Sequence, residues 1–139
     1  MSAVCELPQV DVKAIEVHAQ DMNLARAAEI YLQYGCLVVR GLHRQYVDAV
    51  NRDIERAAQQ AISLLDRAKK VTEGWVTPDH TLFLPAPRGF HRDKQIMVLA
   101  CGYSISAAFL KAAQDSMTLD LVEKIVGPDV ELFLNGQCL

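Results

Sequence analysis

The sequence predicts an α+β protein, because stretches with helical spacing of apolar residues alternate with short β-branched runs. Two amphipathic stretches begin near Asp21 and Arg44, and a third ends at Gly127-Pro128. Between them lie strand-like runs such as CLVVRG and KQIMVLACG. At 139 residues the chain has the length of one ordinary domain and can bury a core.

The first helix is expected between Asp21 and Gly35. Asp21 suits the N-cap position, and Gly35 suits the left-handed residue that ends a helix. Apolar side chains recur between them with three- and four-residue spacing, which describes one helix face. These side chains are Leu24, Ala27, Ala28, Tyr31 and Leu32. The run CLVVRG, closed by Gly41, is expected to follow as a strand.

A long helix is expected from about Arg44, with apolar spacing that continues from Val47 to Ala68. Residues 71–89 hold three prolines and two glycines, which predicts an irregular loop with at most one short strand, at TLFLP. We expect no domain boundary there. Two aromatic residues in this loop, Trp75 and Phe83, fit either a cover over a substrate entrance or packing against a helix.

The last third should form a strand at KQIMVLACG and two helices. The first helix, SISAAFLKAAQ, has Ser104 or Ser106 as its cap. The second, SMTLDLVEKIVG, stops at Gly127-Pro128, and one of its sides carries Met117, Leu121, Val122 and Ile125. The apolar segment DVELFLNGQCL then resembles an unpaired edge, so we expect the chain to stop partway through a larger fold. The alternative is a last strand that pairs internally.

Composition narrows the functional classes. The formal net charge of −3 favours neither nucleic acid nor an anionic membrane surface as a partner. No secretory signal is visible, and the uncharged run from Gln95 to Leu110 is too short to cross a bilayer core of about 30 Å. The cysteines form no CxxC pair and fit reduced thiols in core positions. They are Cys5, Cys36, Cys101 and Cys138. We therefore expect a cytoplasmic protein.

Two motifs in order, YLQYGCLVVRGL and LVEKIVGPDVELFLNGQCL, give the chain a resemblance to a known family. Their pattern resembles the N-terminal portion of the phytanoyl-CoA dioxygenase family, whose members are iron(II)- and 2-oxoglutarate-dependent oxygenases. In that family a helix leads into a "dGf-vv-g" strand, and a helix ending in "l-Gpd" leads into a core strand. The resemblance covers most of residues 21–139.

The resemblance implies a double-stranded β-helix, two packed sheets with helices supporting one of them. Residues 1–20 would be an N-terminal extension. Residues 21–139 would be the helical support and first core strand of a domain that continues past Leu139. The parent enzyme would use Fe(II) and 2-oxoglutarate to oxidise a C–H bond of a small-molecule substrate. This chain would lack the metal half, which becomes its expected partner, and alone it would be inactive.

The triplet His91-Arg92-Asp93 has the His-x-Asp spelling of a non-haem iron site, but its context does not fit. A facial triad needs a second histidine, which the family places far downstream, and no histidine follows Asp93. In the family His-x-Asp also follows the Gpd strand, whereas this triplet precedes Gly127. A kinase interpretation fails because the chain has no glycine-rich phosphate loop and no DFG. We interpret the triplet as polar residues at a loop-to-strand junction.

No residue of the chain is expected to be catalytic or to bind metal, but two are candidates for cofactor binding. Lys94 opens a segment from which the family can send a basic side chain to the co-substrate carboxylate; a solvated lysine is the alternative. Gln137, with Asn135, falls on one face of the last strand, facing either the pocket or solvent.

Two other functions stay open. One is a non-catalytic α+β interaction module that binds a protein through its last strand or through the long helix over residues 44–70. The weaker one is a metal or thiol enzyme that uses His80, His91, Asp79 and Asp93.

Overall fold

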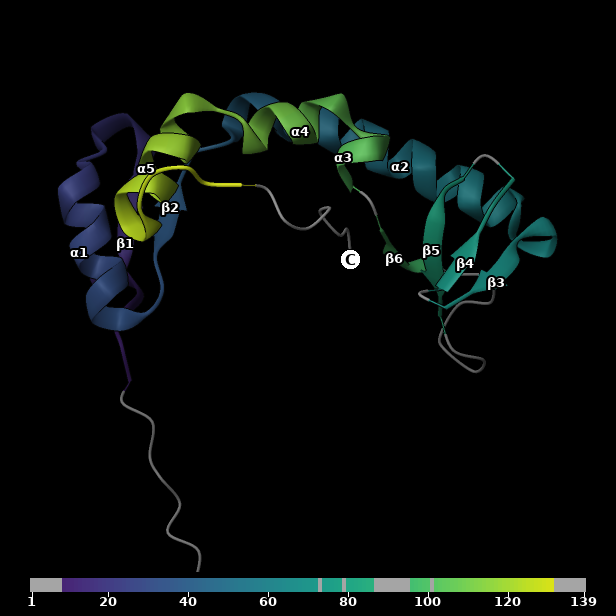
Figure 1. Ribbon diagram of the computed structural model, residues 1–139, viewed down its shortest axis with the longest axis horizontal. Helices are drawn as coiled ribbons and strands as arrows, with labels where there is room; N and C mark the ends of the chain where they lie inside the picture. The colour runs from purple at the N-terminus through teal and green to yellow at the C-terminus, as the bar shows by residue number, and fades with distance from the viewer. Residues whose placement is uncertain (1–8, 73, 79, 87–95, 101, 132–139) are drawn as a thin grey trace, which may run out of the picture. The chain divides into compact units, whose positions relative to one another are not determined.

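The computed structural model describes residues 9–72, 74–78, 80–86, 96–100 and 102–131 (Figure 1). The described residues form a mixed α+β protein, as predicted, with five α-helices and a small antiparallel sheet. The chain divides into two compact units, which the sequence did not indicate. Unit 1 comprises Met1–Leu42 and Ser116–Val130, and unit 2 comprises His43–Asp115 and Glu131–Leu139.

Unit 1 pairs two short strands and packs two helices against each other (Figure 1). Its elements are the 3-10 turns η1 (Val12–Ala14) and η2 (Ala19–Asp21), strands β1 (Glu16–His18) and β2 (Val38–Arg40), and helices α1 (Leu24–Tyr34) and α5 (Ser116–Val126). The strands are parallel, with Val17 opposite Val39. The strand in CLVVRG is thus confirmed. Its partner β1 was not predicted, and it lies in the segment expected as an extension.

Helix α1 begins at a different cap from the predicted one. The Asn23 side chain accepts a hydrogen bond from the Arg26 backbone N–H at 3.0 Å, whereas Asp21 ends a preceding 3-10 turn. Asparagine is as good an N-cap as aspartate, so composition alone could not choose between them. The predicted end is confirmed: Gly35 has φ 72°, and its N–H donates to the Tyr31 carbonyl.

The helix faces are predicted well for α5 and only partly for α1. In α5 Leu121 is buried, and the other three residues of the predicted face are half-buried. In α1 the residues that pack are Ala27, Ala28 and Ile30. Tyr31 and Leu32 were expected on that face, but Leu32 is 75% exposed. The apolar residues of α1 run almost around the helix, so the pattern left more than one choice of buried face.

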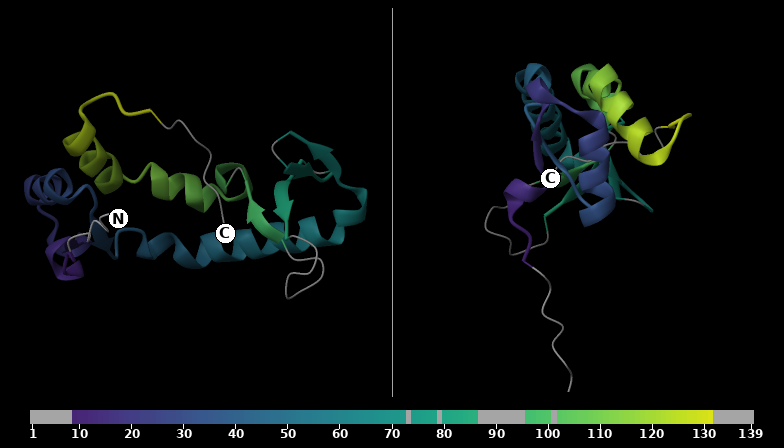
Figure 2. Two further views of the ribbon diagram at one scale, coloured as in Figure 1. Left: turned by 90° about the horizontal axis from the view of Figure 1, so that it is seen from below. Right: turned by 90° about the vertical axis from the view of Figure 1, so that its left-hand side faces the viewer.

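Unit 2 is a four-stranded antiparallel sheet with helices. Its strands are β3 (Lys69–Val71), β4 (Gly74–Val76), β5 (Leu82–Pro85) and β6 (Ile96–Leu99), in that spatial order. Its helices are α2 (Val47–Ser63), α3 (Gly102–Ile105) and α4 (Ala107–Ala113), with 3-10 turns η3 (Arg44–Tyr46) and η4 (Leu65–Arg67) flanking α2. In Figure 2, α4 lies beside α2.

For unit 2, the predicted end of the long helix and the predicted irregular loop need correction, and two predicted strands are confirmed. The long helix ends at Ser63 rather than Ala68, because Leu64 leaves the helical conformation. The expected irregular loop instead contributes β4 as well as β5, and β3 precedes it. The strands at TLFLP and KQIMVLACG are confirmed.

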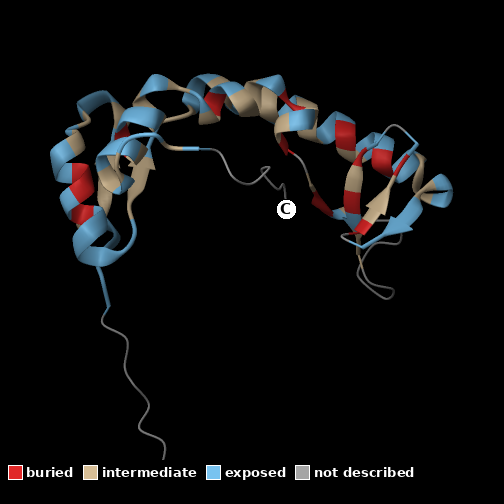
Figure 3. Cartoon of the chain, viewed as in Figure 1, coloured by how far each residue is buried: buried red, intermediate tan, exposed pale blue. Residues whose placement is uncertain are grey.

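The core of unit 2 lies between one face of this sheet and α2 (Figure 3). Strand register aligns Trp75 with Phe83 and Phe83 with Leu99, which gives a row across three strands. Phe83 is fully buried and packs in one cluster with Leu99 and with Ala57 and Ala61 of α2. Trp75 packs against the same cluster. The helix-packing interpretation of Trp75 and Phe83 is therefore the one that the structure bears out.

The opposite face of the sheet is also apolar. Side chains alternate along a strand, so the neighbours of the core row point away from α2. They pair across strands as Val76 with Leu82 and Leu84 with Val98. Leu84 is 37% exposed, although its partner Val98 is buried. A sheet with two apolar faces is typical of a sheet that lies between two layers.

Two other sequence expectations can be compared with the described residues. Cys36 is exposed, directly after the turn at Gly35, so its predicted core position is wrong; the other cysteines lie outside the described residues. Within the same ranges, no helix is both long and apolar enough to cross a membrane.

Ser106 joins α4 to α2 and is the cap that the sequence left open with Ser104. Its hydroxyl accepts from the Phe109 N–H at 3.1 Å and donates to Asp53 Oδ2 at 2.8 Å. Asp53 also forms a salt bridge with Arg56. Ser106 is buried, whereas Ser104 is exposed within α3. The buried Ser106 hydroxyl therefore caps the N-terminus of α4 and also donates a hydrogen bond to the Asp53 carboxylate of α2.

We predict that Ser106→Ala destabilises unit 2 by roughly 1–3 kcal/mol, because it removes the cap and leaves Asp53 short of a partly buried donor. Trp75 is the only tryptophan of the chain and packs on this core, so urea unfolding followed by its fluorescence measures the effect. Ser104→Ala is the matched control and should leave the midpoint nearly unchanged. Equal effects of the two variants would contradict the assignment of the cap.

We also predict that Gly74→Ala destabilises unit 2 by roughly 2–4 kcal/mol, since it combines backbone strain with overpacking. Gly74 has φ 154°, and a Cβ there would lie 2.7 Å from the Phe83 carbonyl oxygen. Trp75 fluorescence again follows the unfolding. In the control Gly35→Ala, φ is 72° but nothing lies within 4 Å of the added carbon, so only about 1–2 kcal/mol of strain is expected. Hydrogen exchange of the α1 amides measures that cost. An unchanged unfolding midpoint for Gly74→Ala would contradict the close approach.

Candidate functional site

The cofactor-binding candidates, their neighbour Asn135 and the possible iron triplet lie outside the part of the chain that the structure describes. They are Lys94, Gln137, Asn135 and the triplet His91-Arg92-Asp93. The structure therefore neither brings them together nor separates them, and their roles stay predictions. The candidate site is built instead from residues whose positions are described.

The described histidines lie in three different settings. His18 is on β1, 3.6 Å from Glu16. His43 precedes η3, where its Nδ1 is buried and has no hydrogen-bond partner among the described residues. His80 lies in the turn between β4 and β5. Across the described ranges, no group of three His, Cys, Asp or Glu side chains is placed to hold a metal ion.

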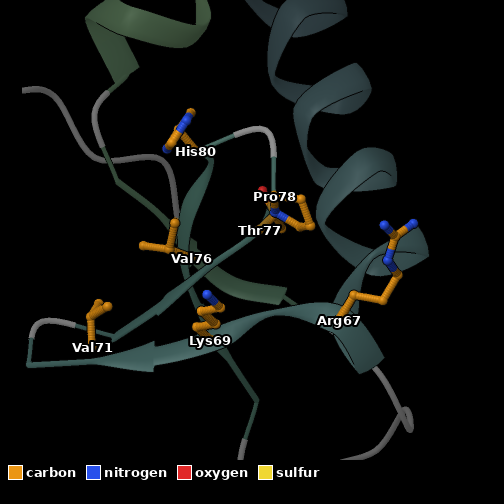
Figure 4. Close-up of a pocket in the computed structure, with 7 residues that line it drawn as sticks. All are labelled: Arg67, Lys69, Val71, Val76, Thr77, Pro78 and His80. Carbon is orange, nitrogen blue, oxygen red and sulfur yellow. The ribbon is translucent and has the colours of Figure 1, made fainter.

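Unit 2 contains a pocket of about 320 Å³ beside the β3–β4 hairpin (Figure 4). It is lined by Arg67, Lys69, Val71, Val76, Thr77, Pro78 and His80. These residues come from η4, from two adjacent strands and from the turn after β4. The lining therefore combines three basic side chains with an apolar wall.

Strand register explains why Lys69, Val71 and Val76 share one side of the hairpin. Lys69 is directly opposite Val76, and Val71 is two residues beyond Lys69 on the same strand. Side chains two residues apart point to the same face. Trp75 points to the other face, where it packs on the α2 core. The pocket is thus on the face of the sheet that α2 does not cover.

The turn that carries His80 is fixed by hydrogen bonds. The Thr77 hydroxyl accepts from the Thr81 N–H at 3.0 Å, and the Thr77 carbonyl accepts from the His80 N–H at 2.9 Å. Both threonines are buried. His80 is held at φ 67°, a left-handed conformation that is uncommon outside glycine. The strain persists because the bonds on both sides of His80 determine the backbone there.

The pocket was not predicted from the sequence, because most of the residues that form β3 were expected to continue the long helix. The segment RAKK at residues 67–70 was assigned to the end of the long helix, and Val71 was assigned to the irregular loop after it. In a helix the alternation of Arg67, Lys69 and Val71 has no meaning, because residues two apart do not share a helix face. In a strand the same alternation places Lys69 and Val71 on one face. The signal was therefore present, but the helix end at Ser63 had to be known to interpret it.

A second polar cluster in unit 2 joins η3 to the end of α4. The Tyr46 hydroxyl donates to Asp115 Oδ2 at 2.9 Å, and Gln45 Nε2 donates to the same oxygen at 3.3 Å. Asp115 is thus held by two neutral donors that are adjacent in the sequence. This geometry fixes the ends of two elements, and it resembles no nucleophile–base arrangement.

The shifted carboxyl pKa in unit 1 has a cross-strand cause. Arg40 Nη2 of β2 lies 2.8 Å from Glu16 Oε2 of β1. The hydrogen bond from Arg40 lowers the pKa of Glu16 and outweighs the desolvation that would raise it. Arg40 belongs to the motif YLQYGCLVVRGL, so one residue of the family-like pattern is used to join two strands.

Comparison with known proteins gives no further assignment: no protein-family model, no curated protein and no solved structure matches the chain.

We predict that unit 1 loses stability at acidic pH through Glu16. A carboxyl with a lowered folded-state pKa stabilises the fold above its unfolded pKa of about 4.3, and this contribution disappears as the pH falls through the folded value. Carbon-detected NMR titration should give Glu16 a pKa below its ordinary value. Arg40→Gln should return it to normal, and Arg26→Gln, which removes only the pair with Glu29, should not. An identical Glu16 titration in all three proteins would contradict the pairing.

Proposed function

We propose that the chain is the N-terminal part of an Fe(II)- and 2-oxoglutarate-dependent dioxygenase that oxidises a small organic substrate at a C–H bond. The proposal begins from the resemblance of YLQYGCLVVRGL and LVEKIVGPDVELFLNGQCL to the phytanoyl-CoA dioxygenase family. The metal-binding half would follow Leu139 as a continuation of the same domain, and cytoplasm is the expected compartment.

The observation that carries the proposal is the second apolar face of the sheet in unit 2. A double-stranded β-helix consists of two packed sheets, one of them supported by helices. Here α2 covers one face, while Val76, Leu82, Leu84 and Val98 point away from it. Val98 is already buried, but a second sheet would remove Leu84, which is 37% exposed, and the half-buried Val76 and Leu82 from water. The β-helix fold is thus supported by a surface that fits a second layer.

Unit 1 adds a second support. The two family-like motifs are separated by most of the chain, yet α1, β2 and α5 lie in the same compact unit, and α1 packs against α5. The first motif runs from the end of α1 through Gly35 into β2, and the second runs through the end of α5 to Gly127. Both glycines have positive φ, as the helix-to-strand turns of the pattern require.

The described residues contribute support rather than chemistry in this proposal. They offer no set of three ligands for iron, so no catalytic step is assigned to them. Bound Fe(II) with 2-oxoglutarate would supply the oxidising chemistry in the parent enzyme. The role of unit 2 would be to hold one sheet rigid through its contact with α2, because a functional site tolerates little displacement of the residues that line it. Lys94 and Gln137 remain the candidates for contact with the co-substrate.

The test is to tag the N-terminus of the protein in its natural source and determine its intact mass, together with the coding sequence after Leu139. We expect a mass above 15.4 kDa and a continuation that contains His-x-Asp with a distal histidine and arginine. The purified product should release succinate from 2-oxoglutarate when Fe(II) is supplied. A stop codon introduced after Leu139 provides the matched control and should abolish this release.

A genuine stop codon at that point, with a mass of 15.4 kDa, would overturn the oxygenase proposal. A stable, monodisperse chain without affinity for Fe(II) or 2-oxoglutarate would then favour the interaction module. Capture of one defined protein by the tagged chain, lost when residues 129–139 are deleted, would support that function directly.

A further inference from the structure

We propose that the pocket beside the β3–β4 hairpin binds a small organic anion that carries a carboxylate on a short apolar chain. The proposal does not depend on the oxygenase assignment, because the described residues that line this pocket all belong to unit 2. It rests on the charge of the lining, on its apolar wall and on the fixed position of His80.

Three described arginines form salt bridges, whereas Arg44, Arg52 and Arg67 form none with a described carboxylate. Arg26, Arg40 and Arg56 each form a salt bridge with a carboxylate. Among the described residues, neither Arg67 nor Lys69 does so. Their charges are therefore not compensated by a described partner, and both line the same small volume. A carboxylate in that volume would accept a charge-assisted hydrogen bond from either of them.

His80 adds a third donor from the other side of the pocket (Figure 4). Its backbone is held in the left-handed region by the bonds within the Thr77–Thr81 turn. Backbone strain of this kind costs about 1–3 kcal/mol and is concentrated at binding and catalytic positions. An imidazole ring carries an N–H donor in either protonation state, so His80 can donate to an anion whether or not it is charged.

The rest of the lining sets the size and character of the ligand. Val71, Val76 and Pro78 form an apolar wall beside the cations. A volume of about 320 Å³ is at the lower limit for ligand pockets, which span roughly 300–1,000 Å³. A short alkyl chain could pack against these apolar side chains, whereas a hydrated ion such as phosphate would make no apolar contact with them. The class that matches both halves of the lining is a short-chain carboxylate.

The experiment is an amide NMR titration of the 139-residue chain with hexanoate. We expect saturable shifts that cluster at Val71, Val76, Thr77 and His80. Hexanol, which lacks the charge, and inorganic phosphate, which lacks the chain, should each bind more weakly. Added salt should weaken hexanoate binding, because the cations are exposed.

Variants separate this site from general attraction to basic residues. Arg67→Gln and Lys69→Gln should each weaken hexanoate binding about threefold, as expected for a partly exposed charge contact, and the double variant about tenfold. Lys111→Gln is the control, since Lys111 is an exposed lysine of unit 2 on α4 and does not line the pocket. Unchanged Trp75 fluorescence will show that the variants fold.

Three results would overturn the proposal. They are scattered or non-saturating shifts, equal binding of hexanoate and hexanol, and an equal loss of affinity in Lys111→Gln and Lys69→Gln. Phosphate binding as tight as that of hexanoate would show that the apolar wall is not used and would overturn the ligand class.

Discussion

The contact between Phe83 and the alanines of α2 is the constraint on which unit 2 depends. Ala57 and Ala61 are one helical turn apart, so they present two short side chains on the same face of the helix. This lets a sheet bearing a fully buried aromatic ring approach the helix closely. An aromatic side chain buries roughly 150–250 Å², so Phe83 supplies a large share of this small core.

That contact also determines which side chains lie on the face of the sheet that points away from α2. Once Phe83 points to α2, register and alternation send Trp75 and Leu99 to the core, while Val76 and Leu84 point away. Lys69 follows Val76, with which it is paired. A shift of one residue in β5 would exchange these faces and place Leu82 and Leu84 against α2 in place of Phe83. The pocket lining and the second apolar face are therefore both consequences of one packing choice.

Much of the secondary structure could be predicted, because caps and periodicity are local properties of the chain. Gly35, Ser106 and Gly127 each lie where their backbone or side-chain chemistry is needed. The predictions failed where the local sequence is compatible with two structures. Asn23 and Asp21 are equal as caps, and the segment before β3 continues the apolar spacing of α2 past its actual end. Strand β4 was missed because Gly74 suggested a loop, whereas the glycine is required by the close approach of the Phe83 carbonyl.

The candidate site was less predictable than the fold, since its residues meet only through register. Arg67 and His80 are far apart in the sequence, and they come to line one pocket only once β3, β4 and β5 are paired. The residues chosen from family resemblance, Lys94 and Gln137, depended on an assumed fold rather than on contacts within this chain.

The two proposals share Val76 and otherwise use different parts of the same sheet face. Neighbouring strands are about 4.8 Å apart, so β3 and β6, with two strands between them, are separated by roughly 14 Å. The apolar pair Leu84 and Val98 lies on β5 and β6, whereas the cations Arg67 and Lys69 lie at the β3 edge. A layer that packs on the apolar half gains by excluding water, but burying the charges of Arg67 and Lys69 would cost it free energy. The charge at the β3 edge therefore favours a second layer that stops short of the pocket, which would leave an anion access to Arg67 and Lys69 even with that layer in place.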